Sequence, residues 1–403
     1  MYRSQRIKVV AAAVLFMFVS SSVFSKPAPQ AIAMGGGKLI PTIKFTEEYN
    51  DNIFSQNDSL FSTKSSMISR LAPVVQFLSE IDASYMAVTY TGDFGYYHSS
   101  SDDNYDDHTL SFDGLFRPTD LYTVGLGASL GHLHENRGEG SSEGINAELR
   151  KEPDEYDIDN ANLLFDFGRD TARFGFTGTA SHTKIKYTTN RKDTQFRDRR
   201  ETDFGGRFYG RAGGKTRFFA EIGRKEFSYS TDPPLGPGID SVNDVYYIGA
   251  SWDATGKTSG SVRFGRLEKD FDSSELKDGD INVWDVDITW SPRTYSAFVF
   301  STSQDANESN GTGTFIEARN TSLAWFHSWS ARTRTTVSIG IGTDQFENSQ
   351  REDDRQIYSL GVDYDWRRWV TVGATYSYIE RDSNFNIFDF ERNLFVVTFD
   401  ISL

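Results

Sequence analysis

The feature that most constrains the fold is a regular alternation of apolar residues with small or acidic residues, in stretches of about ten residues. Between Tyr358 and Trp366, apolar residues occupy every second position, with Ser, Gly and Asp between them. The same pattern recurs at 122–131, 284–290 and 370–378. Because successive side chains of a β-strand point to opposite faces, it predicts strands with one apolar and one polar face.

Turn residues separate these stretches and form two alternating classes of connection. The short turns are predicted at 81–82, 117–120, 168–171, 212–215, 254–257, 291–294, 330–332 and 366–368. The long polar loops are predicted at 50–65, 99–104, 134–154, 188–199, 231–242, 272–279, 304–318, 348–354 and 382–390. The resulting fold class is an all-β, transmembrane, antiparallel outer-membrane β-barrel of about eighteen strands, with sixteen as the alternative. Bacterial barrels of this kind place the short turns in the periplasm and the long loops outside the cell.

The tryptophans and the C-terminus support a membrane barrel. Trp284 is the only one of the seven tryptophans that lies far from a predicted short turn. Indole rings favour the headgroup level of a bilayer, so the other six are expected to form a periplasmic aromatic girdle. The last strand alternates from Phe395 to the final residue. It resembles the C-terminal signal recognised by the outer-membrane barrel assembly machinery, although Leu403 stands where Phe or Trp is usual.

The N-terminus predicts secretion. Arg3, Arg6 and Lys8 precede an apolar segment of eleven residues, 9–19, and small residues follow. This order is typical of a signal peptide, and the apolar segment is too short to span a bilayer as a helix. We predict a signal peptide at 1–25, with cleavage after residue 33 as the alternative, and a single barrel domain at 26–403. The expected location is the cell outer membrane of a Gram-negative bacterium.

Charge and cysteine content exclude two further classes of protein. The net charge of −15 argues against a nucleic-acid partner, because binding phosphates needs a basic surface. Cysteine is absent, so a disulfide scaffold is excluded.

The residue types that carry catalysis or bind metals show no convincing arrangement. The six histidines form no evident set with a nucleophile and an acid, and we interpret them as interfacial or loop residues. The acidic run Asp102–His108 could bind Ca²⁺ or supply the acids of a surface protease, but it lacks the alternating ligands and glycine of a calcium loop. We interpret this run, and 351–355, as solvated outer loops that meet lipopolysaccharide through bridging cations. No enzymatic activity, cofactor or metal is predicted.

The polar faces of the strands supply candidates for the lining of a channel, since a barrel of sixteen to eighteen strands encloses a lumen. The residues expected to face it are Arg173, Arg207, Tyr209, Arg211, Arg217, Glu221, Tyr247, Arg263, Asp285, Asp287, Asp363 and Asp365. Arginine forms bidentate hydrogen bonds and aromatic rings stack on sugars, so this set suits a hydrated sugar. The alternative is that opposite charges pair across strands only to support the wall.

Local sequence in the first hairpins resembles a known family. The segments that carry the resemblance are Tyr49–Phe54, Leu71–Pro73, Tyr90–Tyr97 and Asp102–His108. They resemble the putative beta-barrel porin 2 group, which includes the EpsL-like and VpsM-like outer-membrane barrels of exopolysaccharide operons. The motif positions whose role stays open are Tyr49, Asp51, Asn52, Asp106, Asp107 and His108.

The resemblance implies a pore that exports a nascent exopolysaccharide of a biofilm or capsule matrix. It implies three kinds of partner: the polysaccharide, the outer-membrane lipid and lipopolysaccharide around the barrel, and periplasmic or inner-membrane export components. It carries over no catalytic residue.

Three other functions stay open at this point. They are a general or sugar-specific diffusion porin, a surface enzyme using Asp107 and His108, and a structural or adhesive barrel. The length of the loop at 134–154 suggests that it folds inward and gates the pore, in which case deleting Glu135–Glu152 would raise the conductance. The charge of the polymer and the oligomeric state are not determined by the sequence.

Overall fold

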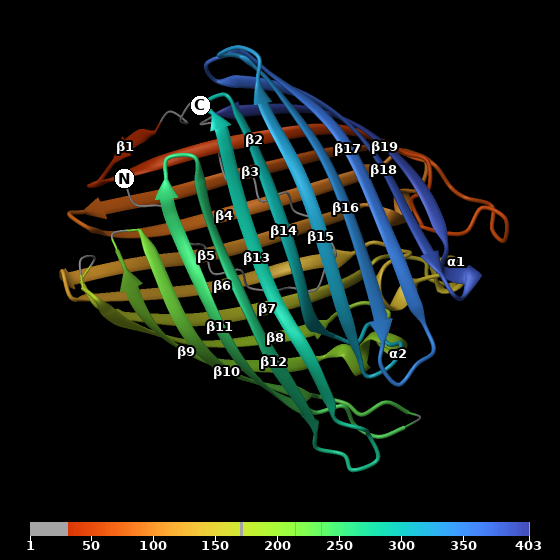
Figure 1. The fold of residues 1–403 in the computed structure, drawn as a ribbon. Coiled ribbons are helices and arrows are strands. Elements are labelled where there is room, and N and C mark those ends of the chain that lie inside the picture. The colour runs from red at the N-terminus through yellow and green to blue at the C-terminus, as the bar shows by residue number, and fades with distance from the viewer. Residues whose placement is uncertain (1–30, 170–171, 214, 235, 403) are drawn as a thin grey trace.

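The chain forms a closed antiparallel β-barrel (Figure 1). The computed structural model describes residues 31–402 apart from 170–171, 214 and 235, so the predicted signal peptide at 1–25 lies outside the described residues. Eighteen of the described strands form the wall, as predicted. The first nine wall strands are β2 (Gly37–Asn50), β3 (Ser66–Ile81), β4 (Ser84–Tyr97), β5 (Tyr105–Thr119), β6 (Tyr122–Glu135), β7 (Asp154–Phe167), β8 (Phe174–Tyr187), β9 (Arg199–Ala212) and β10 (Thr216–Tyr229). The other nine are β11 (Ser241–Thr255), β12 (Thr258–Phe271), β13 (Gly279–Arg293), β14 (Ser296–Glu308), β15 (Phe315–Ser328), β16 (Thr333–Phe346), β17 (Glu352–Arg367), β18 (Val370–Ser383) and β19 (Phe390–Ser402).

The remaining elements are short. The three-residue strand β1 (Ile32–Met34) pairs with Gly37–Leu39 at the start of β2. The helices α1 (Asn146–Leu149) and α2 (Arg191–Thr194) and four 3-10 turns lie in the loops. None of the described helices is long and apolar enough to cross a membrane.

Short and long connections separate to opposite ends of the barrel, which we call the turn end and the loop end. The observed connections follow the predicted ones closely except at 304–318. There β14 continues to Glu308 and β15 begins at Phe315, so the loop spans only 309–314. Paired strands continue through a polar segment because the backbone hydrogen bonds between β14 and β15 do not depend on side-chain polarity.

The outer face of the wall carries a band of exposed apolar side chains. Phe208, Phe218, Ile248 and Leu360 are each more than half exposed in the isolated chain, as expected for side chains that contact lipid. Four of the six tryptophans predicted to form a girdle are exposed at the turn end, namely Trp290, Trp329, Trp366 and Trp369.

The barrel closes between its first and last wall strands. β2 and β19 pair from Thr42↔Ser402 to Asn50↔Leu394. Asp51 accepts hydrogen bonds of 2.7 Å from both the backbone and the side-chain nitrogen of Asn393. Buried Asn52 donates to the carbonyl oxygens of Gln56 (2.8 Å) and Glu391 (3.0 Å). These two residues of the family-like motif therefore fasten the first loop to the last strand.

Candidate transport path through the barrel

The strand register places every predicted lumen residue that lies on a strand on the inner face. Arg207 pairs with Glu221, Glu221 with Tyr247, and Arg263 with both Gly249 and Asp285, so these positions share one face across β9–β13. The neighbouring positions on the other face are the exposed apolar residues of the outer wall. We call the inner face of β9–β13 the charged strip.

Three aromatic rings of the charged strip lie against glycines of adjacent strands. The best-defined example is Tyr247, where a Cβ atom at Gly265 would come within 2.6 Å of the ring. The guanidinium of Arg263 covers the ring with its carbon 4.4 Å from the ring centre. The same order of glycine, ring and arginine recurs at Gly249, Phe219 and Arg207, and again at Gly175, Tyr209 and Arg217. We call each set of three a layer.

These layers change the expected role of the tyrosines. Tyr209 and Tyr247 are only 5% and 8% exposed, because glycine lies on one side of each ring and arginine near the other. Little ring surface is left for a passing sugar to stack on. The strip instead presents charged groups to the lumen, namely the arginines and the acids paired with some of them.

Most cations of the strip are paired with acids. Glu221 accepts hydrogen bonds from Arg207 (2.7 Å) and from Arg263 (3.1 Å), and Asp285 lies 4.0 Å from Arg263. Nearer the loop end, Lys225 forms an ion pair of 2.8 Å with Glu201. The charges in the middle of the strip thus pair across strands, which is one of the two interpretations given for the predicted lumen residues.

Two of the predicted lumen acids lie in a different sector. Asp363 and Asp365 are on β17, and Asp365 forms an ion pair of 2.6 Å with Arg334. Asp287, on β13, accepts a hydrogen bond of 2.6 Å from Ser301. The structure therefore distributes the predicted set between the charged strip and a second site on β16–β17.

Small and hydroxyl-bearing side chains line the inner face from β14 to β18. Ser301 pairs with Ser322, Ser338 with Ser359, and Ser359 with Ser377. The hydroxyl groups of Ser359 and Ser377 share a hydrogen bond of 2.8 Å. These side chains present uncharged donors and acceptors, beside the charged residues of β16–β17 and next to the charged strip.

Residues 136–153, between β6 and β7, form a loop that crosses the loop end, which we call the crossing loop. Arg137 forms an ion pair with Asp103, and Gly138 packs on the backbone of Phe54. Gly138 has a φ of 89°, and a Cβ atom there would collide with the Phe54 carbonyl, so this position requires glycine. Asn310, eight connections further around the wall, donates to Glu143 of the same loop.

Glu143 ties the crossing loop to the opposite wall. Its two carboxylate oxygens accept hydrogen bonds from Arg351 (2.7 Å) and Arg381 (2.6 Å). Arg351 is 2% exposed and also pairs with Asp353. The interpretation of 351–355 as a solvated loop is therefore wrong for Arg351 and Asp353, because the crossing loop covers them. No local pattern marks Glu143 as their partner, since it lies about two hundred residues away in the sequence.

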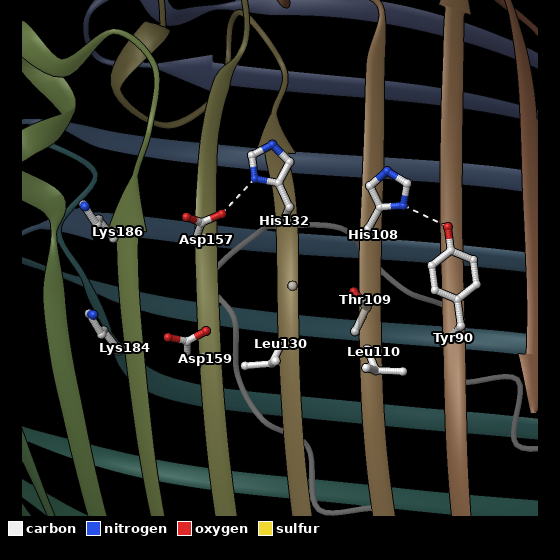
Figure 2. A pocket seen from close by; sticks show the side chains of 11 residues that line it. Tyr90, His108, Thr109, Leu110, Leu130, His132, Asp157, Asp159, Lys184 and Lys186 are labelled. Atoms are coloured by element: carbon white, nitrogen blue, oxygen red, sulfur yellow. Dashed lines mark hydrogen bonds and ion pairs between the residues drawn. The ribbon is translucent and has the colours of Figure 1, made fainter.

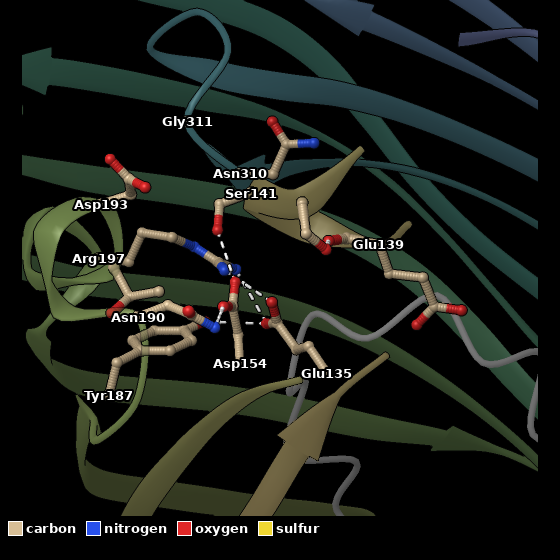
Figure 3. A network of polar contacts seen from close by, with 12 residues as sticks. Glu135, Glu139, Ser141, Asp154, Tyr187, Asn190, Asp193, Arg197, Asn310 and Gly311 are labelled. Carbon is tan, nitrogen blue, oxygen red and sulfur yellow. Dashed lines mark hydrogen bonds and ion pairs between the residues drawn. The ribbon is translucent and has the colours of Figure 1, made fainter. Parts of the chain in front are cut away.

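The near end of the crossing loop is held by a second polar network (Figure 3). Arg197 forms an ion pair of 2.6 Å with Glu135, which also accepts a hydrogen bond of 2.8 Å from Tyr187. Asp154 accepts a hydrogen bond of 2.7 Å from Ser141 of the crossing loop. Burial raises the pKa of Glu139 in the same loop.

The predicted histidine and acid candidates lie outside the lumen or apart from one another. His108 and His132 lie on the outer wall, in a hollow with Asp157, Lys184 and Lys186 (Figure 2). His108 contacts the Tyr90 hydroxyl at 2.8 Å.

The remaining motif positions are dispersed as well. Asp107 binds His134 at 2.8 Å, Asp106 lies 3.5 Å from His108, and Tyr49 is exposed on the outer wall. The structure thus does not bring Asp107 and His108 together as a catalytic pair. Within 31–402, gaps aside, no three His, Asp or Glu side chains are grouped to hold a metal ion.

Comparison with known proteins gives one match to a family by sequence and several similar structures by fold. Residues 26–402 match the family described as putative beta-barrel porin 2. OccK3 (OpdO) of Pseudomonas aeruginosa superposes with a TM-score of 0.50 at 13% identity, covering 91% of this chain and 96% of that one.

The FrpB iron transporter of Neisseria meningitidis, in its apoprotein form, gives a TM-score of 0.50 at 11% identity. That alignment covers 85% of this chain but only 62% of FrpB. At these identities the structural likeness shows a shared barrel fold alone. A search of curated proteins found no match.

Proposed function

Because the chain belongs to the putative beta-barrel porin 2 family, we propose that it is an outer-membrane channel that exports a polysaccharide chain. The mechanism is passive conduction through a hydrated lumen, with no reaction catalysed. In the proposed orientation the turn end faces the periplasm and the loop end faces the cell exterior.

The observation that carries this proposal is the polar lining of the inner wall. The charged strip on β9–β13 and the hydroxyl-bearing sector on β14–β18 are neighbours, so one face of a polymer can meet charge while the other meets hydroxyl groups. A sugar chain exposes hydroxyls all round and can exchange its hydrogen bonds with water for bonds to such walls. The resemblance to barrels of exopolysaccharide operons supports the same substrate.

A sugar-selective diffusion porin is the second candidate, and the crossing loop favours it. This loop reaches from β6–β7 to Asn310, Arg351 and Arg381 on the opposite side of the wall. A channel narrowed in this way suits small solutes unless the loop moves during transport.

The proposed partners follow from export. Periplasmic or inner-membrane export components would deliver the polymer to the turn end. Lipopolysaccharide and outer-membrane lipid would surround the apolar outer wall, and the barrel assembly machinery would insert the chain.

The decisive experiment measures where polymer accumulates in a strain that lacks this chain. Extracellular and periplasmic polysaccharide would be quantified with and without complementation by the full-length gene. We expect surface polymer to disappear and periplasmic polymer to rise. Unchanged surface polymer, together with slower uptake of small sugars into the deletion strain, would instead establish the diffusion porin.

A further inference from the structure

Three arginines at the turn end of the charged strip have no acidic partner among the residues that the structure describes. Arg211 of β9 and Arg217 of β10 are direct cross-strand partners on the inner face. Arg173 immediately precedes β8, and its carbonyl oxygen accepts a hydrogen bond of 2.7 Å from the backbone N–H of Arg211. By contrast, Arg207 and Arg263, further along the strip, share Glu221.

Within the part of the chain that the structure describes, the positive charges of these arginines are therefore not offset by an ion pair. Like charges placed directly opposite each other on adjacent strands destabilise a sheet. Arg211 also has a buried Nε atom that finds no hydrogen-bond partner. Asp166 is an acid on the inner face of β7, but it accepts a hydrogen bond of 2.7 Å from Thr177 and does not pair with these arginines. An external anion bound to the exposed ends of these guanidinium groups would offset their repulsion.

The site is also organised before any ligand arrives. The ring of Tyr209 lies against Gly175, and the guanidinium carbon of Arg217 lies 5.2 Å from the ring centre. A larger residue at Gly175 would displace the ring, so the glycine fixes the surface on which Arg217 rests.

We propose that Arg173, Arg211 and Arg217 bind the acidic groups of an anionic polysaccharide as it reaches the turn end. The planar guanidinium fork matches a carboxylate in a bidentate manner, so uronic-acid residues are the expected ligands. This inference rests on the proposed export function and adds the charge class of the polymer. A free small anion such as phosphate offers the same chemistry, so the test must separate the two.

The rest of the strip explains why binding at this site does not trap the polymer. Beyond Arg217, the next arginines are already neutralised by Glu221 and Asp285. An acidic sugar therefore meets strong attraction at the turn end and weaker attraction further in. The turn end therefore selects acidic sugars, while the rest of the strip binds them weakly enough for the polymer to move on.

The test uses the purified full-length barrel in planar lipid bilayers. Current block would be measured with hexagalacturonate, with neutral maltohexaose and with inorganic phosphate, each added at the turn end. The test variant is Arg211→Gln/Arg217→Gln. The matched control, Lys184→Gln/Lys186→Gln, removes the same charge from the outer wall (Figure 2). The two single arginine variants replace the double variant if it does not assemble.

We expect hexagalacturonate to block the native channel, and its affinity to fall about ten-fold or more in the arginine variant, because charge-assisted hydrogen bonds are lost. Maltohexaose should bind weakly and equally to all three proteins, and the lysine control should behave as native. Equal block by the two hexasaccharides, or unchanged affinity in the arginine variants, would overturn the proposal. Displacement of hexagalacturonate by phosphate at matching concentrations would also overturn it, in favour of a small-anion site.

The bilayer test of the arginines and the export test in the deletion strain can fail independently of each other. If block depends on the arginines while the deletion strain still exports polymer, the anion site stands and export fails. If the deletion strain loses export while block ignores the arginines, export stands and the anion site fails.

Discussion

At the scale of single residues, glycine determines where the aromatic rings of the lumen lie. Gly265, Gly249 and Gly175 each leave the space that a ring from the neighbouring strand occupies. The ring then supports an arginine that points into the lumen. A glycine in the interior of a strand normally weakens it, so its presence here marks a position where close approach is needed.

Gly265→Val tests this arrangement. The added side chain would collide with the Tyr246 carbonyl and the Tyr247 ring, and we expect a loss of about 1–3 kcal/mol in the free energy of unfolding. Urea unfolding in lipid vesicles, followed by tryptophan fluorescence, measures the loss. Gly206→Val is the matched control, since a Cβ atom there meets nothing closer than 3.6 Å. Equal destabilisation of both variants would contradict the account.

Glu139 is the residue of the crossing loop that we expect to make the loop respond to pH. Burial raises its pKa above the ordinary 4.5, and the charged or titratable groups that act on it are Arg392, Glu135 and His134. A carboxyl with a raised pKa stabilises the closed loop at acidic pH, and that stability is lost as pH rises from its ordinary pKa to its raised pKa.

We therefore expect openings of the channel to become more frequent as pH rises from about 4 towards neutrality. Glu139→Gln, which cannot ionise, should remove this component of the pH dependence. Single-channel recording of both proteins across that range isolates it from other titrating groups. Identical pH profiles would show that Glu139 does not contribute.

At the scale of elements, the crossing loop is the main addition to a simple barrel. Glu143 is its most distant anchor, and removing one partner of a buried ion pair typically destabilises by about 3–5 kcal/mol. We expect Glu143→Ala to produce transient openings to a higher conductance, because Arg381 loses its bond to the loop and Arg351 keeps only Asp353. Glu148→Ala, an exposed position in the same loop, serves as the control.

Deleting residues 138–149 should have a larger effect on conductance than Glu143→Ala. Arg137 and Arg150 remain to anchor the shortened connection, while every contact of Glu143 and Gly144 is lost. The single-channel conductance should rise relative to the native protein. A conductance that does not change would show that the narrowest point of the path lies elsewhere.

The strands could be predicted from the sequence, whereas the loop contacts could not. Alternation has a period of two, and each strand carries its own signal, so the eighteen strands and their inner faces follow from local pattern. The inward position of Arg207 and Glu221 is predictable for this reason. The bond between Glu143 and Arg351 joins residues that no periodic pattern links, and the burial of Arg351 depends on it. The same applies to Tyr209, whose lumen-facing position follows from alternation but whose burial depends on Gly175 of another strand.

At the scale of the whole molecule, the two ends of the barrel differ in the length and charge of their connections. Among the described residues, arginines without an ion pair gather at the turn end, while the acids of the crossing loop lie at the loop end. This polarity has meaning for transport only if the barrel has one fixed orientation in the membrane.

The absence of cysteine allows a clean test of orientation. Ser274→Cys lies in the exposed β12–β13 loop, and Lys257→Cys lies in the exposed β11–β12 turn. In intact cells, a membrane-impermeant maleimide should label Ser274→Cys only. After the outer membrane is permeabilised, both variants should react. Labelling of Lys257→Cys in intact cells would show that the barrel has the opposite orientation, and it would contradict the proposed direction of capture.

The seam between β2 and β19 has a consequence for how the chain is made. Its pairs join residues 42–50 to residues 394–402, so the first wall strand has no partner on one side until the last strand has been synthesised and delivered. Until then both strands expose unpaired backbone groups, which invite pairing with other chains. Contacts of such large sequence separation also form slowly. Cells that produce this protein must therefore shield two open edges during its biogenesis, and Asp51 and Asn52, which bind the last strand, are positioned to secure the seam once it forms.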